Sequence, residues 1–134
     1  MSDSKETVRR LLEDGFGRGQ LTALAETLSP EVVFHGGPLG STRGTDEIVA
    51  TMAEYRSAFP DMMIRVEDQI AEDDRVATRF QVSGTNTGSL VGYPPTGNSI
   101  SVQVINVARV EEGVIVEVWS ETDALELLDQ LDLV

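Results

Sequence analysis

The sequence contains no cysteine among its 134 residues. Disulfide bonds, thiolate metal sites and cysteine nucleophiles are therefore excluded from its chemistry. Histidine is almost as scarce, because His35 is the only one. One histidine with scattered carboxylates does not make a typical metal site. We therefore expect no metal site.

Long apolar runs are also missing. No segment approaches the roughly 20 apolar residues that a membrane-spanning helix requires. The N-terminus is polar up to Glu6 and leads directly into a helical pattern, which differs from a signal peptide. We expect a cytoplasmic protein that has no membrane partner.

Basic residues are few, at 10 against 23 acidic residues, and Lys5 is the only lysine. The resulting net charge of −13 repels phosphate backbones, which argues against nucleic-acid binding. The aromatic content of 5% gives a base-stacking role little basis either. An acidic surface that is poor in lysine suits a high-salt cytoplasm, where ions screen the repulsion. A halophilic source and an ordinary acidic protein both remain open interpretations.

The hydrophobic pattern changes its period along the chain. A period of 3.6 residues predicts three helices in the first 60 residues, and a period of two predicts strands after them. The first helix begins at Asp3, the second carries Leu21 to Leu28 before Pro30, and the third runs from Thr45 or Asp46 to Phe59. Strands are expected at 31–35, 62–71, 75–83, 100–110 and 114–120, with a last helix at 125–131.

This order of elements predicts the α+β class and one domain over residues 1–134. Short turns between the later strands indicate a curved antiparallel sheet. To bury its apolar face, the sheet has to wrap around the N-terminal helices. We expect a cone with an internal pocket that is open at one end.

Three polar residues stand out as candidates for a site. His35 ends a strand and is able to polarise a carbonyl or relay a proton, or it is a hydrogen-bonded rim residue. Arg79 lies mid-strand, where it orients a ligand or pairs with an acid on a neighbouring strand. Asn106 interrupts an apolar row, so its amide needs a partner from the protein or from a ligand. The aromatic residues Tyr55, Phe59 and Trp119 are expected in the core and the pocket wall.

Several short motifs, in order and over nearly the whole chain, resemble one family. They are Arg43-Gly44-Thr45-Asp46-Glu47-Ile48, Ala58-Phe59-Pro60-Asp61, Asp74-Arg75-Val76-Ala77-Thr78-Arg79, Gly84-Thr85-Asn86-Thr87-Gly88, Gly92-Tyr93-Pro94-Pro95-Thr96-Gly97, Glu117-Val118-Trp119-Ser120-Glu121-Thr122-Asp123 and Leu127-Leu128-Asp129-Gln130-Leu131. Together they resemble the SnoaL-like polyketide cyclase and ester cyclase group of the nuclear transport factor 2-like superfamily.

The resemblance implies a cone-shaped domain, usually a homodimer, whose pocket works without a cofactor. It also implies an intramolecular aldol reaction whose acid/base is Asp123, at the start of the last helix. Asn86 stands where the group often has a histidine, and an amide orients a carbonyl but does not exchange protons. Asp123 and Glu126 also spell a capping box, which is a purely structural alternative.

The leading hypothesis is an acid–base enzyme that cyclises, isomerises or hydrates a small hydrophobic carbonyl compound. The alternatives are a binding domain with the same pocket and a dimerisation module. Val104 and Ile105 illustrate that the long strands carry apolar residues at both parities, which is typical of strands buried on both faces. We therefore expect a homodimer in which a second copy covers the outer face of the sheet.

Overall fold

The computed structural model describes residues 3–36 and 40–133. Helices α1 (Asp3–Arg9), η1 (Arg10–Gly17), α2 (Leu21–Thr27) and α3 (Thr45–Ala58) come before most of the sheet, and α4 (Ala124–Gln130) follows it. The strands are β1 (Leu28–Gly36), β2 (Thr42–Arg43), β3 (Met63–Glu72), β4 (Arg75–Thr85), β5 (Ser99–Glu111) and β6 (Val114–Thr122). The predicted α+β class is confirmed.

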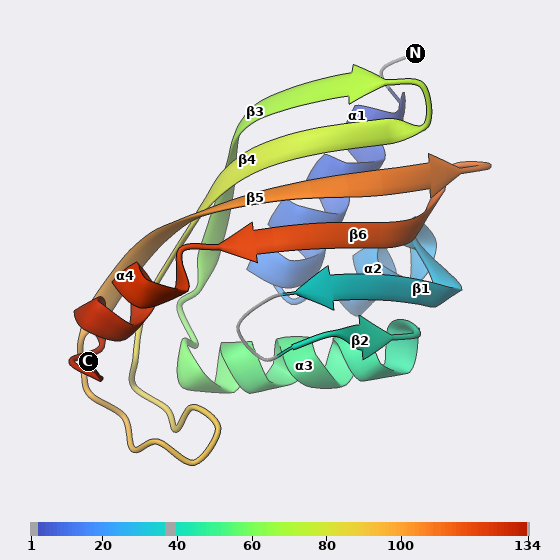
Figure 1. Cartoon of the computed structure of the whole chain (residues 1–134). Helices are drawn as coiled ribbons and strands as arrows, with labels where there is room; N and C mark the ends of the chain where they lie inside the picture. Colours follow the sequence, from blue (N-terminus) through green and yellow to red (C-terminus); the bar gives the residue numbers. More distant parts are fainter. Residues whose placement is uncertain (1–2, 37–39, 134) are drawn as a thin grey trace.

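The sheet has six strands in the order β2-β1-β6-β5-β4-β3 and is not closed. Neighbouring strands are antiparallel except β1 and β6, which are parallel, so the sheet is mixed. Figure 1 shows its long strands curving, with α1 and α2 behind the sheet and α3 beside β2. The expected wrapping of a curved sheet around the N-terminal helices is confirmed.

The core lies between the helices and the inner face of the sheet. Burial alternates along β5, so that Val102 and Val104 are buried while Gln103 and Ile105 are exposed. The helices contribute a second apolar stripe that faces these strands, formed by Val8, Leu11, Leu12, Leu24, Ile48 and Met52. Within residues 3–36 and 40–133, the hydrophobic core therefore lies on the inner side of the sheet, where α1 and α2 lie behind the long strands (Figure 1).

Two local features differ from the sequence expectations. Leu28 was expected in the second helix, but it begins β1 and pairs with Ile115 of β6. Pro30 accounts for the end of the helix, since it disfavours helical backbone at the preceding Ser29, and proline is tolerated where the ladder is irregular. The register indeed shifts between Leu28 and Val33. The first helix also continues as the π-helix η1, which ends at Gly17.

Candidate functional site

A cavity of about 190 Å³ lies between α3, η1 and the inner face of the sheet. Its wall is mainly aliphatic and aromatic, as expected for a pocket between a curved sheet and its helices. The lining residues are Leu12, Phe16, Phe34, Gly36, Gly40, Thr42, Ile48, Thr51, Met52, Tyr55, Phe59, Met62, Ile64, Phe80, Val82, Leu90, Ile100, Val102, Val104, Asn106, Ser120, Thr122 and Leu127.

The polar groups on the sheet side of this cavity come from two adjacent strands. Asn106 of β5 pairs in register with Ser120 of β6, and Val104 pairs with Thr122. Asn106 is only 4% exposed, and among the described residues its Oδ1 has no hydrogen-bond partner. A buried carbonyl oxygen of this kind normally has a partner. Asn106 is therefore a polar group available to whatever enters the cavity.

Ionised groups are absent from the described part of the cavity wall. The lining between residues 3–36 and 40–133 includes no Asp, Glu, His, Lys or Arg. A charged ligand would lose its hydration there without gaining an opposite charge. The wall therefore favours a neutral molecule.

Asp123 lies at the edge of this wall, between the lining residues Thr122 and Leu127 in the chain. Its side chain is the N-cap of α4, where Oδ1 accepts a hydrogen bond from the backbone N of Glu126 at 3.3 Å. The residue is exposed and does not line the cavity. The capping contact is thus present, and the catalytic role of Asp123 stays a prediction.

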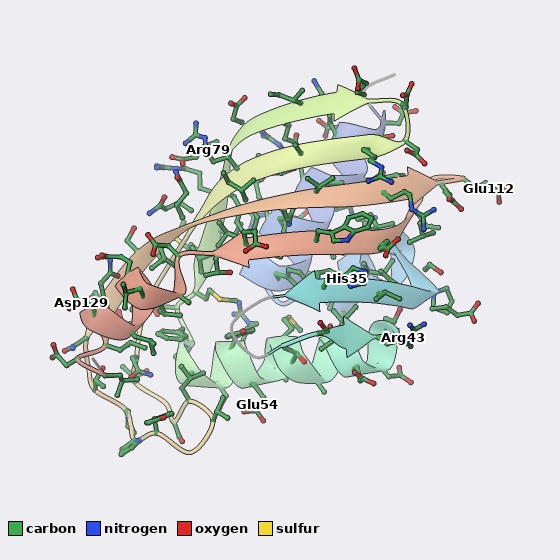
Figure 2. The ribbon with its side chains drawn as sticks, in the orientation of Figure 1. His35, Arg43, Glu54, Arg79, Glu112 and Asp129 are labelled. Carbon is green, nitrogen blue, oxygen red and sulfur yellow. The ribbon has the colours of Figure 1, made fainter. Side chains whose placement is uncertain are left out.

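His35 and Trp119 lie on the outer face of the sheet. Successive side chains on a strand point to opposite faces, and their neighbours Phe34 on β1 and Ser120 on β6 line the cavity. The two rings stack with centroids 5.4 Å apart, and the Arg75 guanidinium lies 5.1 Å from the Trp119 ring centroid. The sequence expectation placed both residues at the pocket, and the geometry separates them from it. Figure 2 labels His35 on β1.

Glu117 joins this outer cluster. His35 Nε2 lies 2.6 Å from Glu117 Oε2, and Arg109 donates to Glu117 Oε1 at 3.1 Å. These hydrogen bonds, from His35 first and Arg109 second, hold the pKa of Glu117 below its ordinary value. Sequence reasoning missed Glu117, although its position two residues from Trp119 on the same strand face could have indicated it.

Arg79 is paired with an acid, as its structural alternative predicted. Its guanidinium Nη1 lies 3.1 Å from Glu67 Oε1, and in register it faces Ile105 rather than a cavity residue. Figure 2 labels Arg79 on the curved part of β4. Arg79 is not part of the cavity, so its proposed contact with a ligand there has no geometric basis.

Asn86 is buried and holds the connection between β4 and β5. Its Nδ2 donates to the carbonyls of Ala58 and Gly88, while its Oδ1 accepts from the backbone N and the hydroxyl of Thr96. These contacts use the hydrogen-bonding capacity of the amide within the protein. Asn86 orders the loop next to the cavity residue Leu90 and does not itself line the cavity.

The structure therefore brings together Asn106, Tyr55 and Phe59 of the predicted site residues. It adds Ser120 and Thr122, which sequence reasoning missed. Their alternation with Trp119 and Glu121 along β6 was the signal that could have found them.

A second, more open hollow of about 480 Å³ lies at α1, η1 and α2. Its lining is mostly charged, and two of its residues, Arg10 and Glu26, form an ion pair at 2.5 Å. Among the described residues, no three His, Asp or Glu side chains gather in a way that could hold a metal ion. We place the candidate site in the apolar cavity.

Comparison with protein families gives a match to the SnoaL-like polyketide cyclase model over residues 6–131. The chain belongs to this family. The SnoaL-like assignment made from the sequence motifs is thereby confirmed. Comparison with curated protein sequences gives no match. In the part of the chain that the structure describes, no helix is long and apolar enough to span a membrane.

Solved structures similar to this SnoaL-like domain include three from Streptomyces. IdmH of Streptomyces antibioticus, named as a candidate polyketide cyclase, is 31% identical with a TM-score of 0.82, covering 96% of this chain and 98% of IdmH. TsrD of Streptomyces laurentii is 26% identical with a TM-score of 0.88, covering 99% and 97%. AclR of Streptomyces galilaeus, named as a candidate hydroxylase, is 28% identical with a TM-score of 0.85, covering 100% and 87%.

Proposed function

We propose that the cavity binds a small, uncharged, mainly hydrophobic carbonyl compound without a cofactor. The observation that carries this proposal is the cavity wall, which is apolar apart from hydroxyls and the Asn106 amide within the described residues. Burial of an apolar ligand supplies the affinity, and the few polar groups orient it. A charged compound would find no counter-ion on that wall.

The cavity volume limits the size of the ligand. About 190 Å³ is close to the roughly 150 Å³ of an apolar cavity that holds benzene, and below the roughly 300 Å³ at which pockets for drug-sized ligands begin. A skeleton of one ring, or of two small rings, fits this space. Leu90, which belongs to the connection between β4 and β5, forms part of the wall.

A second candidate function is acid–base catalysis on the bound carbonyl compound, by cyclisation, isomerisation or hydration. Membership of the SnoaL-like family and the place of Asp123 between two lining residues favour it. In an aldol closure, a base removes a proton beside one carbonyl, the carbanion attacks a second carbonyl, and the alkoxide takes the proton back. Asp123 would perform both transfers after leaving its contact with Glu126. IdmH is named as a candidate cyclase and AclR as a candidate hydroxylase, so these two similar proteins do not indicate one reaction for this chain.

Binding is tested by calorimetry with benzaldehyde and benzoate, which share a ring but differ in charge. We expect benzaldehyde to bind and benzoate to give no measurable heat. Val104→Phe fills the cavity wall and should abolish benzaldehyde binding. Ile105→Phe, the neighbouring residue on the outer face, is the control and should leave it unchanged. Equal binding by the two variants would contradict a ligand site in this cavity.

A further inference from the structure

The inward-facing row of side chains on β5 is apolar except for one residue. Val102, Val104 and Ala108 are buried and apolar, whereas Asn106 is buried and carries an amide. In register, Asn106 stands between Thr78 of β4 and Ser120 of β6. An apolar residue of similar volume at position 106 would continue the row.

The neighbours of Asn106 do not satisfy its carbonyl oxygen. The Thr78 hydroxyl oxygen accepts a hydrogen bond from Gln69 Nε2 at 3.2 Å, and Thr78 makes no hydrogen bond to Asn106 Oδ1. Within residues 3–36 and 40–133, nothing donates to Asn106 Oδ1. A buried acceptor without a partner destabilises the folded state, because the oxygen has lost its water and gained nothing. The amide is therefore costly for the empty protein and complementary to a donor inside the cavity.

We propose that the natural ligand carries a hydroxyl group, phenolic or enolic, on a one- or two-ring skeleton, and that this hydroxyl donates to Asn106 Oδ1. This inference rests on the proposed function, that the cavity binds a small neutral molecule. Asn106 is then the residue that determines specificity, since it separates hydroxylated ligands from hydrocarbons of the same shape. An enolised carbonyl compound satisfies both this requirement and the proposed ligand class.

Several features of the cavity favour a neutral hydroxyl over other donors. An ammonium group would enter a wall without a carboxylate in the described residues. A water molecule needs two to four polar partners to be held in a buried place. Among the lining residues, Ser120 is the polar one that pairs with Asn106 in register, and Thr78 on the other side already accepts a hydrogen bond from Gln69. A ring hydroxyl satisfies the acceptor while the ring fills the apolar volume.

Phenol and toluene test this inference, because they differ only in a hydroxyl against a methyl group. Their dissociation constants are measured with the wild-type protein and with Asn106→Leu. We expect phenol to bind the variant about 2- to 10-fold more weakly, as the loss of one net hydrogen bond predicts. Toluene should bind it equally or more tightly. Val104→Leu, which enlarges a side chain on the same wall, is the control and should affect both probes in the same direction.

A second variant and a direct measurement of the binding position keep the test decisive. Asn106→Val replaces Asn106→Leu if the latter does not fold. Nuclear Overhauser contacts between the phenol ring and the Asn106 amide protons should locate the probe in the wild-type protein. An unchanged phenol-to-toluene ratio in the variants overturns the hydroxyl requirement alone. Failure of both probes to bind the wild-type protein contradicts the binding function as well.

Discussion

Glu117 accepts a hydrogen bond from His35 across β1 and β6, with 2.6 Å between His35 Nε2 and Glu117 Oε2. Arg109 holds the other carboxylate oxygen at 3.1 Å, so both oxygens of Glu117 are engaged. The cluster lies on the outer face of the sheet, opposite the cavity. It therefore ties three strands together without taking part in the proposed ligand site.

The first prediction concerns stability in acid. The pKa of Glu117 is lowered in the folded state, so its stabilising contribution is full above the ordinary value of 4.5 and is lost as the pH falls through the lower folded value. Glu117→Gln should lower the melting temperature at pH 7, and the gap to wild type should close below about pH 4.5. Glu112→Gln, in an exposed turn, is the control and should follow the wild-type curve. A gap that is constant with pH would contradict the linkage.

The second prediction concerns the loop between β4 and β5. Asn86→Ala removes an amide that makes four hydrogen bonds to Ala58, Gly88 and Thr96. The carbonyl of Ala58 then keeps only the hydrogen bond from Gly88 N, and the backbone N of Thr96 loses its acceptor, so the free energy of unfolding should fall by about 1–3 kcal/mol in urea titrations. Amide exchange at Thr96 should also become faster. Thr87→Ala, at an exposed position in the same loop, should change neither quantity appreciably.

Much of the fold was predictable because hydrophobic period and burial agree along the long strands. Alternation at β5 assigns Val102 and Val104 to the core without any knowledge of their partners. Pairing between distant segments was less accessible. The two-residue strand β2 and the parallel contact of β1 with β6 depend on tertiary contacts that a local pattern does not encode.

The candidate site was harder to predict, because alternation along a strand does not indicate which face of the sheet borders a cavity. Asn106 stands out in the sequence as a polar residue in an apolar row, and the structure places it on the cavity wall. His35 and Trp119 are equally distinctive in the sequence, yet the alternation at β1 and β6 directs them to the other face. Asn86 attracted attention through the family motif, while its hydrogen bonds to the loop were not readable from spacing.

The third prediction is a homodimer that pairs through the outer face of the sheet, which we propose on two grounds. Ile105 is 48% exposed there and lies next to the half-buried Val107 and Trp119. On this face Arg79 also pairs with Glu67 and Arg109 with Glu117, so these carboxylates each have a positive charge beside them. Two acidic copies can associate through this face, because it is partly apolar and its paired charges reduce the repulsion between the copies.

Light scattering at micromolar concentration in moderate salt should therefore give twice the monomer mass. Val107→Glu should shift the protein to monomer, because it places a charge in the apolar part of the face. Leu21→Glu, at a 60% exposed position on α2, is the control and should leave the dimer intact. A monomeric wild-type protein would exclude this interface.

The fourth prediction is that sodium chloride stabilises the protein. At a net charge of −13, repulsion acts over the whole surface, and added ions screen it within about 10 Å at 0.1 M. The melting temperature at pH 7 should rise between low and molar sodium chloride. Near the isoelectric point of about 4.2 the rise should largely vanish, since little net charge remains to be screened. A flat or falling melting temperature at pH 7 would count against a halophilic source.

The last prediction separates the two roles of Asp123. Asn caps helices about as well as Asp, so Asp123→Asn should leave the melting temperature nearly unchanged. Asp123→Ala removes the acceptor for the Glu126 N–H and should cost about 1 kcal/mol of stability. An amide does not transfer protons as a carboxylate does. If Asp123 is the acid/base, Asp123→Asn should therefore lower turnover by about 10²- to 10⁴-fold.

This comparison requires a substrate, which a binding screen of hydroxylated and carbonyl ring compounds would supply. Binding should be measured beside turnover, because Asp123 does not line the cavity and neither variant should weaken ligand affinity much. Loss of turnover with intact binding and intact stability assigns the proton transfers to Asp123. Full turnover in Asp123→Asn leaves this residue as the cap of α4, and the cavity is then better described as a binding site.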